Sequence, residues 1–312
     1  MSIRVGVDLG GTKIEVAVLD SDDRIALRRR VTTPRDDYAG ICSAIADLVN
    51  DAERSLGSRG TVGVAIPGAS SPATGLVKNA NTVCLIGQPL AGDLESRLAR
   101  PVRLENDANC FVVSEAADGA AAGAQSVFGV IIGTGCGGGL YLDGAPIRGA
   151  NGIAGEWGHN PAPWPRGGRR ARPCYCGRED CIETYLSGPG LVVTYNELGP
   201  MQCRKVEEIA ASAAAGEAQA RGALALHVEQ LAYALGTIIN VFDPQVVVLG
   251  GGLSNLPNIA AEVASLLPSF IFGPPFVSNV VIAQHGDSSG VRGAAWLWSK
   301  AEAQAAPTRK FP

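Results

Sequence analysis

Two stretches of the chain follow nearly the same pattern, and this repetition constrains the fold more than any other feature. Val5–Leu19 and Val127–Leu142 each contain an apolar run typical of a β-strand, a glycine-rich turn and a returning apolar run. Glycines between two such runs indicate a β-hairpin. The repeat therefore predicts an internal duplication of one α/β unit, and the alternative is two unrelated α/β domains.

Apolar periodicity in the rest of the chain predicts alternating helices and strands. Apolar residues three or four positions apart indicate helices, and short apolar runs that end near Gly or Pro indicate buried strands. Helices are expected at about 37–57, 93–99, 107–118, 217–242 and 291–305, and strands at 62–66, 102–104 and 246–249. Residues 150–190 are expected to be irregular.

With 312 residues the chain is long for a single hydrophobic core, so two domains are expected. The smaller N-terminal α/β domain is expected to comprise residues 1–110, joined by the C-terminal helix at about 291–305. The larger α/β domain is expected to comprise residues 111–290. A duplicated α/β fold of this kind predicts a cleft between its two copies.

The composition argues against several classes of function. The chain is 46% hydrophobic and 18% charged, with a net charge of −4, so we expect neither nucleic acid nor an anionic membrane as a partner. The first apolar strand begins by Ile3, which leaves no room for a signal peptide, and no apolar run approaches the ~18 residues of a membrane span. A cytoplasmic location and reduced cysteines are therefore expected.

The two glycine turns are expected to bind the phosphates of a nucleotide. Glycine lets phosphate oxygens approach backbone amides without a Cβ in the way and allows a positive φ, and threonine adds a hydroxyl donor. The residues concerned are Gly10, Gly11, Thr12, Lys13, Gly133, Thr134 and Gly135. The alternative, a tight hairpin without a ligand, fits either turn alone better than it fits the matched pair. No Gly-x-x-x-x-Gly-Lys-Ser/Thr segment occurs in the sequence, so a P-loop enzyme is not expected.

Two further features belong to this predicted nucleotide site. Asp8 directly precedes the first turn and would repel phosphate unless Mg²⁺ lay between them, so Asp8 is the expected Mg²⁺ ligand. Gly250 and Gly251 follow an apolar strand and are candidates for the place where adenosine lies. A plain turn between a strand and a helix explains these two glycines nearly as well.

Asp107, in the segment Leu104–Asn109, lies between the two turns and is the expected general base. Phosphoryl transfer to an alcohol needs a side chain that orients the hydroxyl and takes its proton. Such a base contributes roughly 10²–10⁴ in rate. The alternative role for Asp107 is that of an N-cap for the helix that begins there.

Polar residues near Asp107 and in the second half offer hydrogen-bonding groups of the type that bind sugar hydroxyls. The candidates are Asn79, Asn81, Asn106, Asn109 and Glu156. The alternative for the asparagines is a loop residue that bonds its own backbone, and this alternative is stronger for Asn81 and Asn109 than for Asn106.

Three cysteines within eight residues, with a histidine upstream, predict a structural zinc site. His159, Cys174, Cys176 and Cys181 make a closed tetrahedral ligand set, and a redox role is the alternative. The metal would hold in position the loop that carries Glu156, and Glu183 follows the last cysteine closely. The adjacent segment 165–173 is expected to be a solvated loop rather than a binding patch, and its arginines are Arg166, Arg169, Arg170 and Arg172.

Together these motifs resemble those of the ROK family (repressors, uncharacterised reading frames and sugar kinases). This family belongs to the larger group of proteins with the actin-like ATPase fold. The resemblance extends over nearly the whole chain. It is carried by residues 8–13, 66–68, 105–109, 133–135, 156–159, 174–183 and 249–252. It implies a duplicated actin-like ATPase (ribonuclease H-like) fold of two α/β domains.

The resemblance also implies a function, an ATP-dependent hexose kinase with Mg²⁺ and structural Zn²⁺ as cofactors. It implies Asp107 as the base and the following sugar-binding residues: Gly68, Asn79, Asn106, Glu156, His159 and Glu183. Segments 77–81, 155–164 and 285–289 look most like the bacterial fructokinase/mannokinase branch, so D-fructose is the expected substrate and mannose a second one. N-acetylglucosamine kinase and glucokinase of the same family are the alternatives, and a homodimer is expected by resemblance.

Two points qualify the resemblance. The family usually has glycine just before the third cysteine, where this chain has Asp180; aspartate is among the few residues that replace a glycine of positive φ. A sugar-responsive regulator without catalysis is the alternative from another functional class. A repressor of this kind needs a helix-turn-helix before the first strand, and that strand begins by Ile3.

Overall fold

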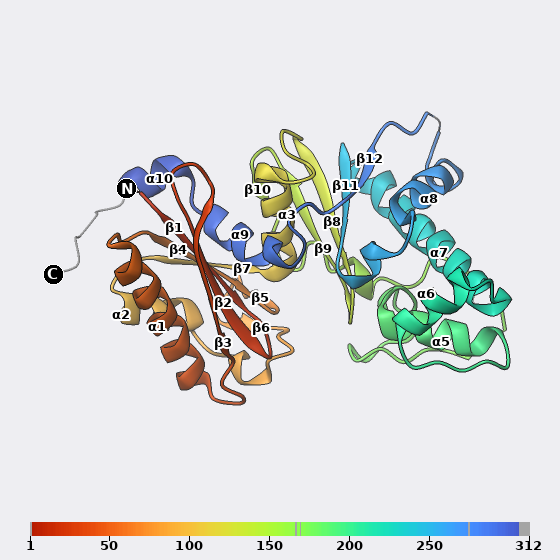
Figure 1. Cartoon of the computed structure of the whole chain (residues 1–312), viewed down its shortest axis with the longest axis horizontal. Helices are drawn as coiled ribbons and strands as arrows, with labels where there is room; N and C mark the ends of the chain where they lie inside the picture. The colour runs from red at the N-terminus through yellow and green to blue at the C-terminus, as the bar shows by residue number, and fades with distance from the viewer. Residues whose placement is uncertain (1, 166, 169, 274, 306–312) are drawn as a thin grey trace. The chain divides into compact units, whose positions relative to one another are not determined.

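The computed structural model describes residues 2–165, 167–168, 170–273 and 275–305. The chain divides into two compact units, and Figure 1 draws both. Unit 1 comprises residues 1–119, 145–154 and 287–312, and unit 2 comprises residues 120–144 and 155–286. Each unit has its own sheet and its own hydrophobic core.

The sheet of unit 1 has the order β3-β2-β1-β4-β7. Its strands are β1 (Arg4–Leu9), β2 (Lys13–Leu19), β3 (Ile25–Thr32), β4 (Thr61–Ile66) and β7 (Val102–Asn106). β2 pairs antiparallel with both β1 and β3, whereas β4 pairs parallel with both β1 and β7. A small hairpin of β5 (Ala69–Ser70) and β6 (Val77–Lys78) follows β4.

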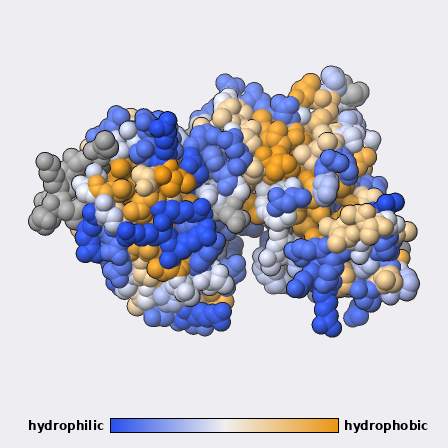
Figure 2. Space-filling view, in the orientation of Figure 1, coloured by the Kyte–Doolittle hydropathy of each residue, from blue (hydrophilic) through white to orange (hydrophobic). Residues whose placement is uncertain are grey.

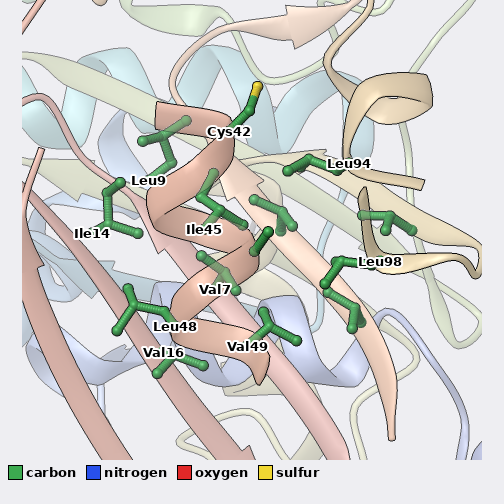
Figure 3. Packing of buried hydrophobic residues seen from close by; sticks show 14 of the residues in the cluster. Val7, Leu9, Ile14, Val16, Cys42, Ile45, Leu48, Val49, Leu94 and Leu98 are labelled. Atoms are coloured by element: carbon green, nitrogen blue, oxygen red, sulfur yellow. The ribbon is translucent and has the colours of Figure 1, made fainter. Parts of the chain in front are cut away.

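Helices cover both faces of this sheet. On one face, α1 (Tyr38–Leu56) and α2 (Leu90–Leu98) enclose the main core, and Figure 3 shows Val7 of β1 beside Ile45 and Val49 of α1. On the other face, α9 (Ser289–Trp296) lies directly on the strands, because a Cβ at Gly6 would meet the Val291 carbonyl oxygen at 2.0 Å. Alternate residues of β1 thus face different helices, as strand geometry requires.

The strands of unit 2 lie in the order β9-β8-β11-β12. They are β8 (Ser126–Ile132), β9 (Cys136–Leu142), β11 (Val246–Gly250) and β12 (Asn279–Ile282), whereas β10 (Ala145–Pro146) falls within the residues of unit 1. β8 pairs antiparallel with β9 and parallel with β11, which pairs parallel with β12. The helices of this unit are α4 (Glu183–Leu186), α5 (Gly188–Leu198), α6 (Val206–Ala214), α7 (Ala218–Phe242) and α8 (Ile259–Leu266).

The duplication predicted from the two glycine hairpins is confirmed by the strand orders. β8 and β9 take the places of β1 and β2, and β11 and β12 take the places of β4 and β7. The antiparallel and parallel pairings agree position by position. The chain is therefore two copies of one α/β plan, as the actin-like ATPase fold requires.

Three expectations about elements need correction. The expected C-terminal helix 291–305 is two helices, α9 and α10 (Lys300–Ala305), separated by three residues. Ser299 caps α10, because its hydroxyl oxygen accepts from the Glu302 amide at 3.2 Å, and Trp298 before it donates to the Val62 carbonyl at 2.7 Å. β3, α5, α6, α8 and β12 were not predicted, and the segment expected to be irregular contains α4.

The division into units also differs from the expected boundary at residue 110. α3 (Asp107–Asp118) belongs wholly to unit 1, because it packs against α9 so closely that a Cβ at Gly293 would lie 1.7 Å from the Cys110 carbonyl oxygen. Residues 145–154 also belong to unit 1, although the chain on either side of them lies in unit 2.

α7 is long and apolar enough, by length and composition, to be considered as a membrane span. Its buried residues, however, lie in the core of unit 2, among them Leu231 and Leu235, which are fully buried. A core helix of a globular unit has this composition too, and we assign α7 that role. On the face shown in Figure 2, hydrophilic and hydrophobic residues are interspersed over both units.

Candidate functional site

Asn106, not Asp107, caps the helix that begins after β7. Asn106 Oδ1 accepts from the amides of Ala108 at 2.9 Å and Asn109 at 3.2 Å, and Asp107 is the first helical residue. Asn106 Nδ2 donates to Asp107 Oδ1 at 3.1 Å and to the Gly68 carbonyl oxygen at 2.9 Å. The alternative role of Asp107 as the N-cap is therefore wrong, and the side chain of Asn106 holds the Asp107 carboxylate in place.

The β5–β6 hairpin lies against this helix start through Gly68. Gly68 has φ +78°, and a Cβ there would lie 2.3 Å from the Lys78 carbonyl oxygen and 2.8 Å from the Ala80 amide nitrogen. Asn79, between these two residues, is exposed and has φ +56°. The structure thus brings Gly68, Asn79, Asn106 and Asp107 to one place in unit 1.

Glu105 organises the same turn, a role that was not predicted from the sequence. Its buried carboxylate accepts from the Asn106 amide at 2.9 Å, from Asn109 Nδ2 at 3.0 Å and from the Arg148 guanidinium. Asn109 is 4% exposed and is held by Glu105, which fits the structural alternative for that residue. The available signal was an acidic residue on a strand immediately before the Asn-Asp pair.

Asp8 lies in a cluster of negative charge at the end of β1. Its pKa is raised to about 6, first by burial and then by the charges of Asp107 and Glu15. Gly290 of α9 allows this burial, since a Cβ there would lie 3.0 Å from Asp8 Oδ2. A partly desolvated carboxylate among other carboxylates is a favourable ligand for a hard cation such as Mg²⁺.

Each of the two glycine turns is closed by a backbone hydrogen bond. The Gly10 amide donates to the Lys13 carbonyl at 3.0 Å, and the Gly133 amide donates to the Gly135 carbonyl at 2.9 Å. Neither amide is therefore directed at a phosphate group. None of these turn glycines has a positive φ, so the conformational argument for glycine does not apply to them.

Gly135 instead leaves room for the Glu183 carboxylate. A Cβ at Gly135 would lie 2.7 Å from Glu183 Oε2, which accepts from the Cys136 amide at 2.8 Å. Glu183 is the first residue of α4 and follows Cys181 by two positions. The second glycine turn and the cysteine loop therefore meet at the Glu183 carboxylate.

Gly155 and Trp157, the residues on either side of Glu156, pack against the glycines of β9. Gly155 has φ +93° and its missing Cβ would lie 2.2 Å from the Gly138 carbonyl oxygen. Trp157 is buried and donates from Nε1 to the Gly137 carbonyl at 2.9 Å. The short 3₁₀ helix Trp157–His159 is thereby fixed on β9, and Glu156 before it is exposed.

Gly250 ends β11, and Gly251 allows the chain to turn against β8. Gly251 has φ +83°, and a Cβ there would lie 2.4 Å from the Ile132 carbonyl oxygen. A 3₁₀ helix, Gly252–Asn255, follows. A turn after a strand is enough to explain these glycines. Contact of Gly250 and Gly251 with adenosine remains a prediction.

His159, Cys174, Cys176 and Cys181 come together as predicted, with all four ligand atoms within 4.8 Å of one another. His159 Nδ1 lies 3.5 Å from Cys174 Sγ, and Cys176 Sγ lies 3.6 Å from Cys181 Sγ. Tetrahedral zinc with Zn–S bonds of about 2.3 Å separates its sulfur ligands by about 3.8 Å. The donor set and its spacing therefore fit zinc.

Tyr175, between Cys174 and Cys176, contacts His159 Nε2, the ring nitrogen that does not face Cys174. Its hydroxyl lies 2.9 Å from His159 Nε2, and the two rings meet edge to face at 5.1 Å. Tyr175 is 83% exposed, and its pKa is raised to about 12 by partial desolvation and by the charges of Glu183 and Glu156. No sequence pattern indicated a role for Tyr175.

Asp180 has φ +52°, which confirms that this position needs the left-handed conformation usual for glycine. Its Oδ1 accepts from the Arg172 amide at 2.9 Å and from the Tyr185 hydroxyl at 2.7 Å. Aspartate therefore fills the place of glycine and adds bonds that brace the cysteine loop.

The expectation that 165–173 is a solvated loop is wrong for Arg172. Arg172 is 6% exposed, lies over the Tyr185 ring at 4.2 Å and donates to the Thr184 carbonyl at 2.9 Å and to Glu197 at 2.7 Å. A buried guanidinium is stable only with such partners. Arg170 is exposed as expected, and Arg166 and Arg169 lie outside the described residues.

Comparisons with known proteins agree with this geometry. The model of the ROK family matches residues 4–301. The N-acetyl-D-glucosamine kinase of Shigella boydii serotype 4 (strain Sb227) is 42% identical over 302 residues, which cover 94% of this chain and 98% of the relative. The enzyme of the same description from Escherichia coli O127:H6 is also 42% identical, over 304 residues, with the same coverage.

Two solved structures share the whole architecture. A ROK hexokinase from Thermus thermophilus has a TM-score of 0.82 and 32% identity, over 94% of this chain and 97% of that one. A ROK family glucokinase from Streptomyces griseus, in complex with glucose and AMPPNP, has a TM-score of 0.76 and 29% identity, over 95% and 98% of the two chains.

Proposed function

The chain belongs to the ROK family and is an ATP-dependent sugar kinase, and we propose that N-acetyl-D-glucosamine is the sugar it phosphorylates. The observation that carries this proposal is the 42% identity, over nearly full length, with two N-acetyl-D-glucosamine kinases. The fructokinase assignment drawn from the sequence motifs has no such support. Fructose therefore becomes a competitor substrate in the test.

In the proposed reaction, Asp107 is the general base for the sugar hydroxyl. Asn106 holds its carboxylate, and Glu105 holds the turn through three hydrogen bonds. One oxygen of Asp107 accepts from the Ala108 amide at 2.8 Å, at the start of a helix, where the negative carboxylate is favoured. A carboxylate base suits a loose transition state, in which the hydroxyl proton leaves late.

The sugar contacts proposed in unit 2 are Glu156, His159 and Glu183, and those in unit 1 are Gly68, Asn79 and Asn106. Glu156 and His159 lie at the two ends of one short segment fixed on β9, and Glu183 lies against the glycine turn of the same strand pair. Both the Oδ1 and the Nδ2 of Asn106 already have hydrogen-bond partners within the protein. Its main proposed role is therefore to position Asp107.

For the nucleotide we propose the two glycine turns with Lys13, Thr12 and Thr134, and Asp8 as the carboxylate that holds Mg²⁺. Mg²⁺ supplies charge neutralisation at the transferred phosphoryl group. Asp8 fits this role because its partly buried carboxylate has acidic neighbours and an elevated pKa. A location inside the cell, where ATP is present, belongs to the same proposal.

The cysteine–histidine cluster is proposed to hold structural zinc. The four ligands close the coordination sphere, so the metal has no open position for chemistry. Its proposed effect is to fix His159 and the chain leading to Glu183, two of the proposed sugar contacts.

A coupled ADP-release assay tests the assignment of the sugar. With MgATP and the purified, zinc-containing chain, kcat/KM is measured for N-acetyl-D-glucosamine, glucose, mannose and fructose. We expect N-acetyl-D-glucosamine to exceed the others by tenfold or more, a transition-state preference of about 1.4 kcal/mol. A preference for fructose of that size would restore the fructokinase assignment, and a flat profile would indicate a broad hexokinase.

A further inference from the structure

Residues 145–154 belong to unit 1, and Arg148 lies where this segment closes into a compact loop. The Ala154 amide donates to the Arg148 carbonyl oxygen at 3.2 Å. Within the loop, the Gly152 amide donates to the Gly149 carbonyl oxygen at 3.1 Å. Both glycines have a positive φ, +58° and +73°, which glycine adopts without strain. The loop therefore fixes the backbone from which the side chain of Arg148 extends.

The 145–154 loop is attached to the β5–β6 hairpin at two places. Lys78 Nζ donates to the Asn151 carbonyl oxygen. A Cβ at Gly152 would lie 3.3 Å from the Ser70 carbonyl oxygen, so the two backbones are in close contact there. The loop is thus held from the side of the hairpin as well as by its own hydrogen bonds.

The side chain of Arg148 pairs with the buried carboxylate of Glu105. The Arg148 guanidinium donates to Glu105 Oε2. The other oxygen, Oε1, accepts from the Asn106 amide at 2.9 Å and from Asn109 Nδ2 at 3.0 Å. The Glu105 side chain is 5% exposed and the Arg148 side chain is 60% exposed. The pair therefore joins the surface of the loop to the interior of the turn before α3.

The charge of Arg148 matters because carboxylates are concentrated at this turn. Burial raises the pKa of the Cys110 thiol, the charges of Glu105, Asp8 and Asp107 raise it further, and the charge of Arg148 lowers it. A buried carboxylate stays ionised only with a cation or hydrogen bonds to compensate it. Within the part of the chain that the structure describes, Arg148 is the cation that pairs with Glu105.

We propose that Arg148 is a positioning residue for phosphoryl transfer, which pairs with Glu105 and so holds the turn that carries Asn106 and Asp107 in its reactive geometry. Arg148 acts through Glu105 and does not itself touch the reacting atoms. The inference rests on the proposed function, because it needs Asp107 to be the base for the sugar hydroxyl.

The first test is Arg148→Met, which removes the guanidinium and keeps most of the apolar side chain. The side chain is largely exposed, so the variant leaves no cavity in the core, and a thermal melt checks that it folds. Kinetics use the sugar of highest kcat/KM among N-acetyl-D-glucosamine, glucose, mannose and fructose. We expect kcat to fall about tenfold, with KM for ATP and for the sugar changed less than about twofold, because a displaced base weakens the transition state and not substrate binding. Arg148→Lys, which keeps the charge but not the planar fork, should lose less.

A double-mutant cycle tests whether Arg148 acts through Glu105. Glu105→Gln keeps an oxygen able to accept from the Asn106 amide and removes the charge that Arg148 pairs with. In the Glu105→Gln chain, Arg148→Met is expected to change kcat less than about twofold, since the interaction is already lost. A full tenfold loss in that chain would overturn the proposal and give Arg148 a role independent of Glu105.

Chemical rescue separates positioning from general support of the fold. In Arg148→Ala, the exposed position lets free guanidinium ion reach Glu105. Guanidinium chloride at a concentration that does not unfold the chain is expected to restore part of kcat, whereas NaCl at the same concentration is not. Arg54→Met, which removes a surface guanidinium paired with Asp51, is the matched control and should keep its kcat and show no response to guanidinium.

The remaining outcomes are equally specific. A kcat of Arg148→Met within about twofold of the unmodified chain would overturn the positioning role, and so would a higher KM for the sugar at unchanged kcat, which would make Arg148 a sugar contact. A lower Tm with a loss of kcat that guanidinium does not restore would reduce Arg148 to a support of the fold. Asp107→Asn separates these results from the proposed function. If Asp107→Asn loses turnover and Arg148→Met does not, the base stands and the inference alone falls; if Asp107→Asn keeps its turnover, both fall.

Discussion

Glu183 Oε2 accepts a hydrogen bond from the Cys136 amide at 2.8 Å, and this bond joins the start of α4 to the second glycine turn. The carboxylate lies where a side chain at Gly135 would be. A residue proposed to bind the sugar is thus positioned by a turn proposed to bind phosphate. The close approach, and not a positive φ, explains the glycine.

Gly135→Ala tests this relationship. The new Cβ would lie 2.7 Å from Glu183 Oε2, so the carboxylate has to move. We expect kcat/KM for the sugar to fall by 10²-fold or more, on the order of the effect of a ~1 Å misplacement. Steady-state kinetics and a thermal melt check this. Gly222→Ala on α7 meets nothing within 4 Å and is the control for glycine replacement; unchanged sugar kinetics in Gly135→Ala would contradict the role of Glu183.

Cys176→Ala tests the zinc assignment. Cys176 is exposed, so its removal creates no cavity in the core, and any effect comes from the lost ligand. We expect less than one zinc per chain by elemental analysis, together with weaker sugar binding or a lower Tm. Cys84→Ala, a cysteine outside the cluster, should keep the metal. Unchanged zinc content and unchanged sugar affinity in Cys176→Ala would refute the structural-zinc assignment.

Asp8 gives the chain a specific dependence of stability on pH. Its pKa in the folded chain is about 6, above the ordinary value of 3.8, so the folded state binds more protons than the unfolded state between these values. Stability should therefore fall as pH rises from about 4 to 6, by at most about 3 kcal/mol from this group. We expect Asp8→Asn to lose activity but to have a higher Tm at pH 8. Melting curves measured across this range with and without the substitution check the sign, which an equal or lower Tm for Asp8→Asn at pH 8 would contradict.

Much of the fold followed from local sequence patterns. The glycine hairpins and α1, whose ends are capped by Asp37 and Gly57, were predictable because their signals lie within a few residues. β3 was missed because it is an edge strand with mostly exposed residues, two of whose arginines pair with Glu15 on β2. The break before α10 depends on Trp298 reaching the Val62 carbonyl, a contact that only the folded chain defines.

The site was predictable where spacing alone carries the chemistry. The zinc ligands and the Asn-Asp pair are of this kind. The role of Glu105 depends on its contact with Arg148, and that of Arg172 on its contacts with Thr184 and Glu197. These partners are distant in sequence, so neither role could be predicted before the fold was known. The sugar could not be assigned from the motifs, because they are shared among hexose kinases. Dimerisation stays a prediction.

The most direct test of the account is the turnover of Asp107→Asn. The substitution keeps the size of the side chain and an oxygen able to accept from the Ala108 amide, and it removes the base. Rapid-quench or coupled assays give kcat, and calorimetry gives the affinity for ATP. Asp51→Asn, which removes a surface carboxylate paired with Arg54, is the control. We expect a 10²–10⁴-fold loss of kcat with ATP affinity intact; turnover within a fewfold of the unmodified chain would contradict the role of Asp107 as the base.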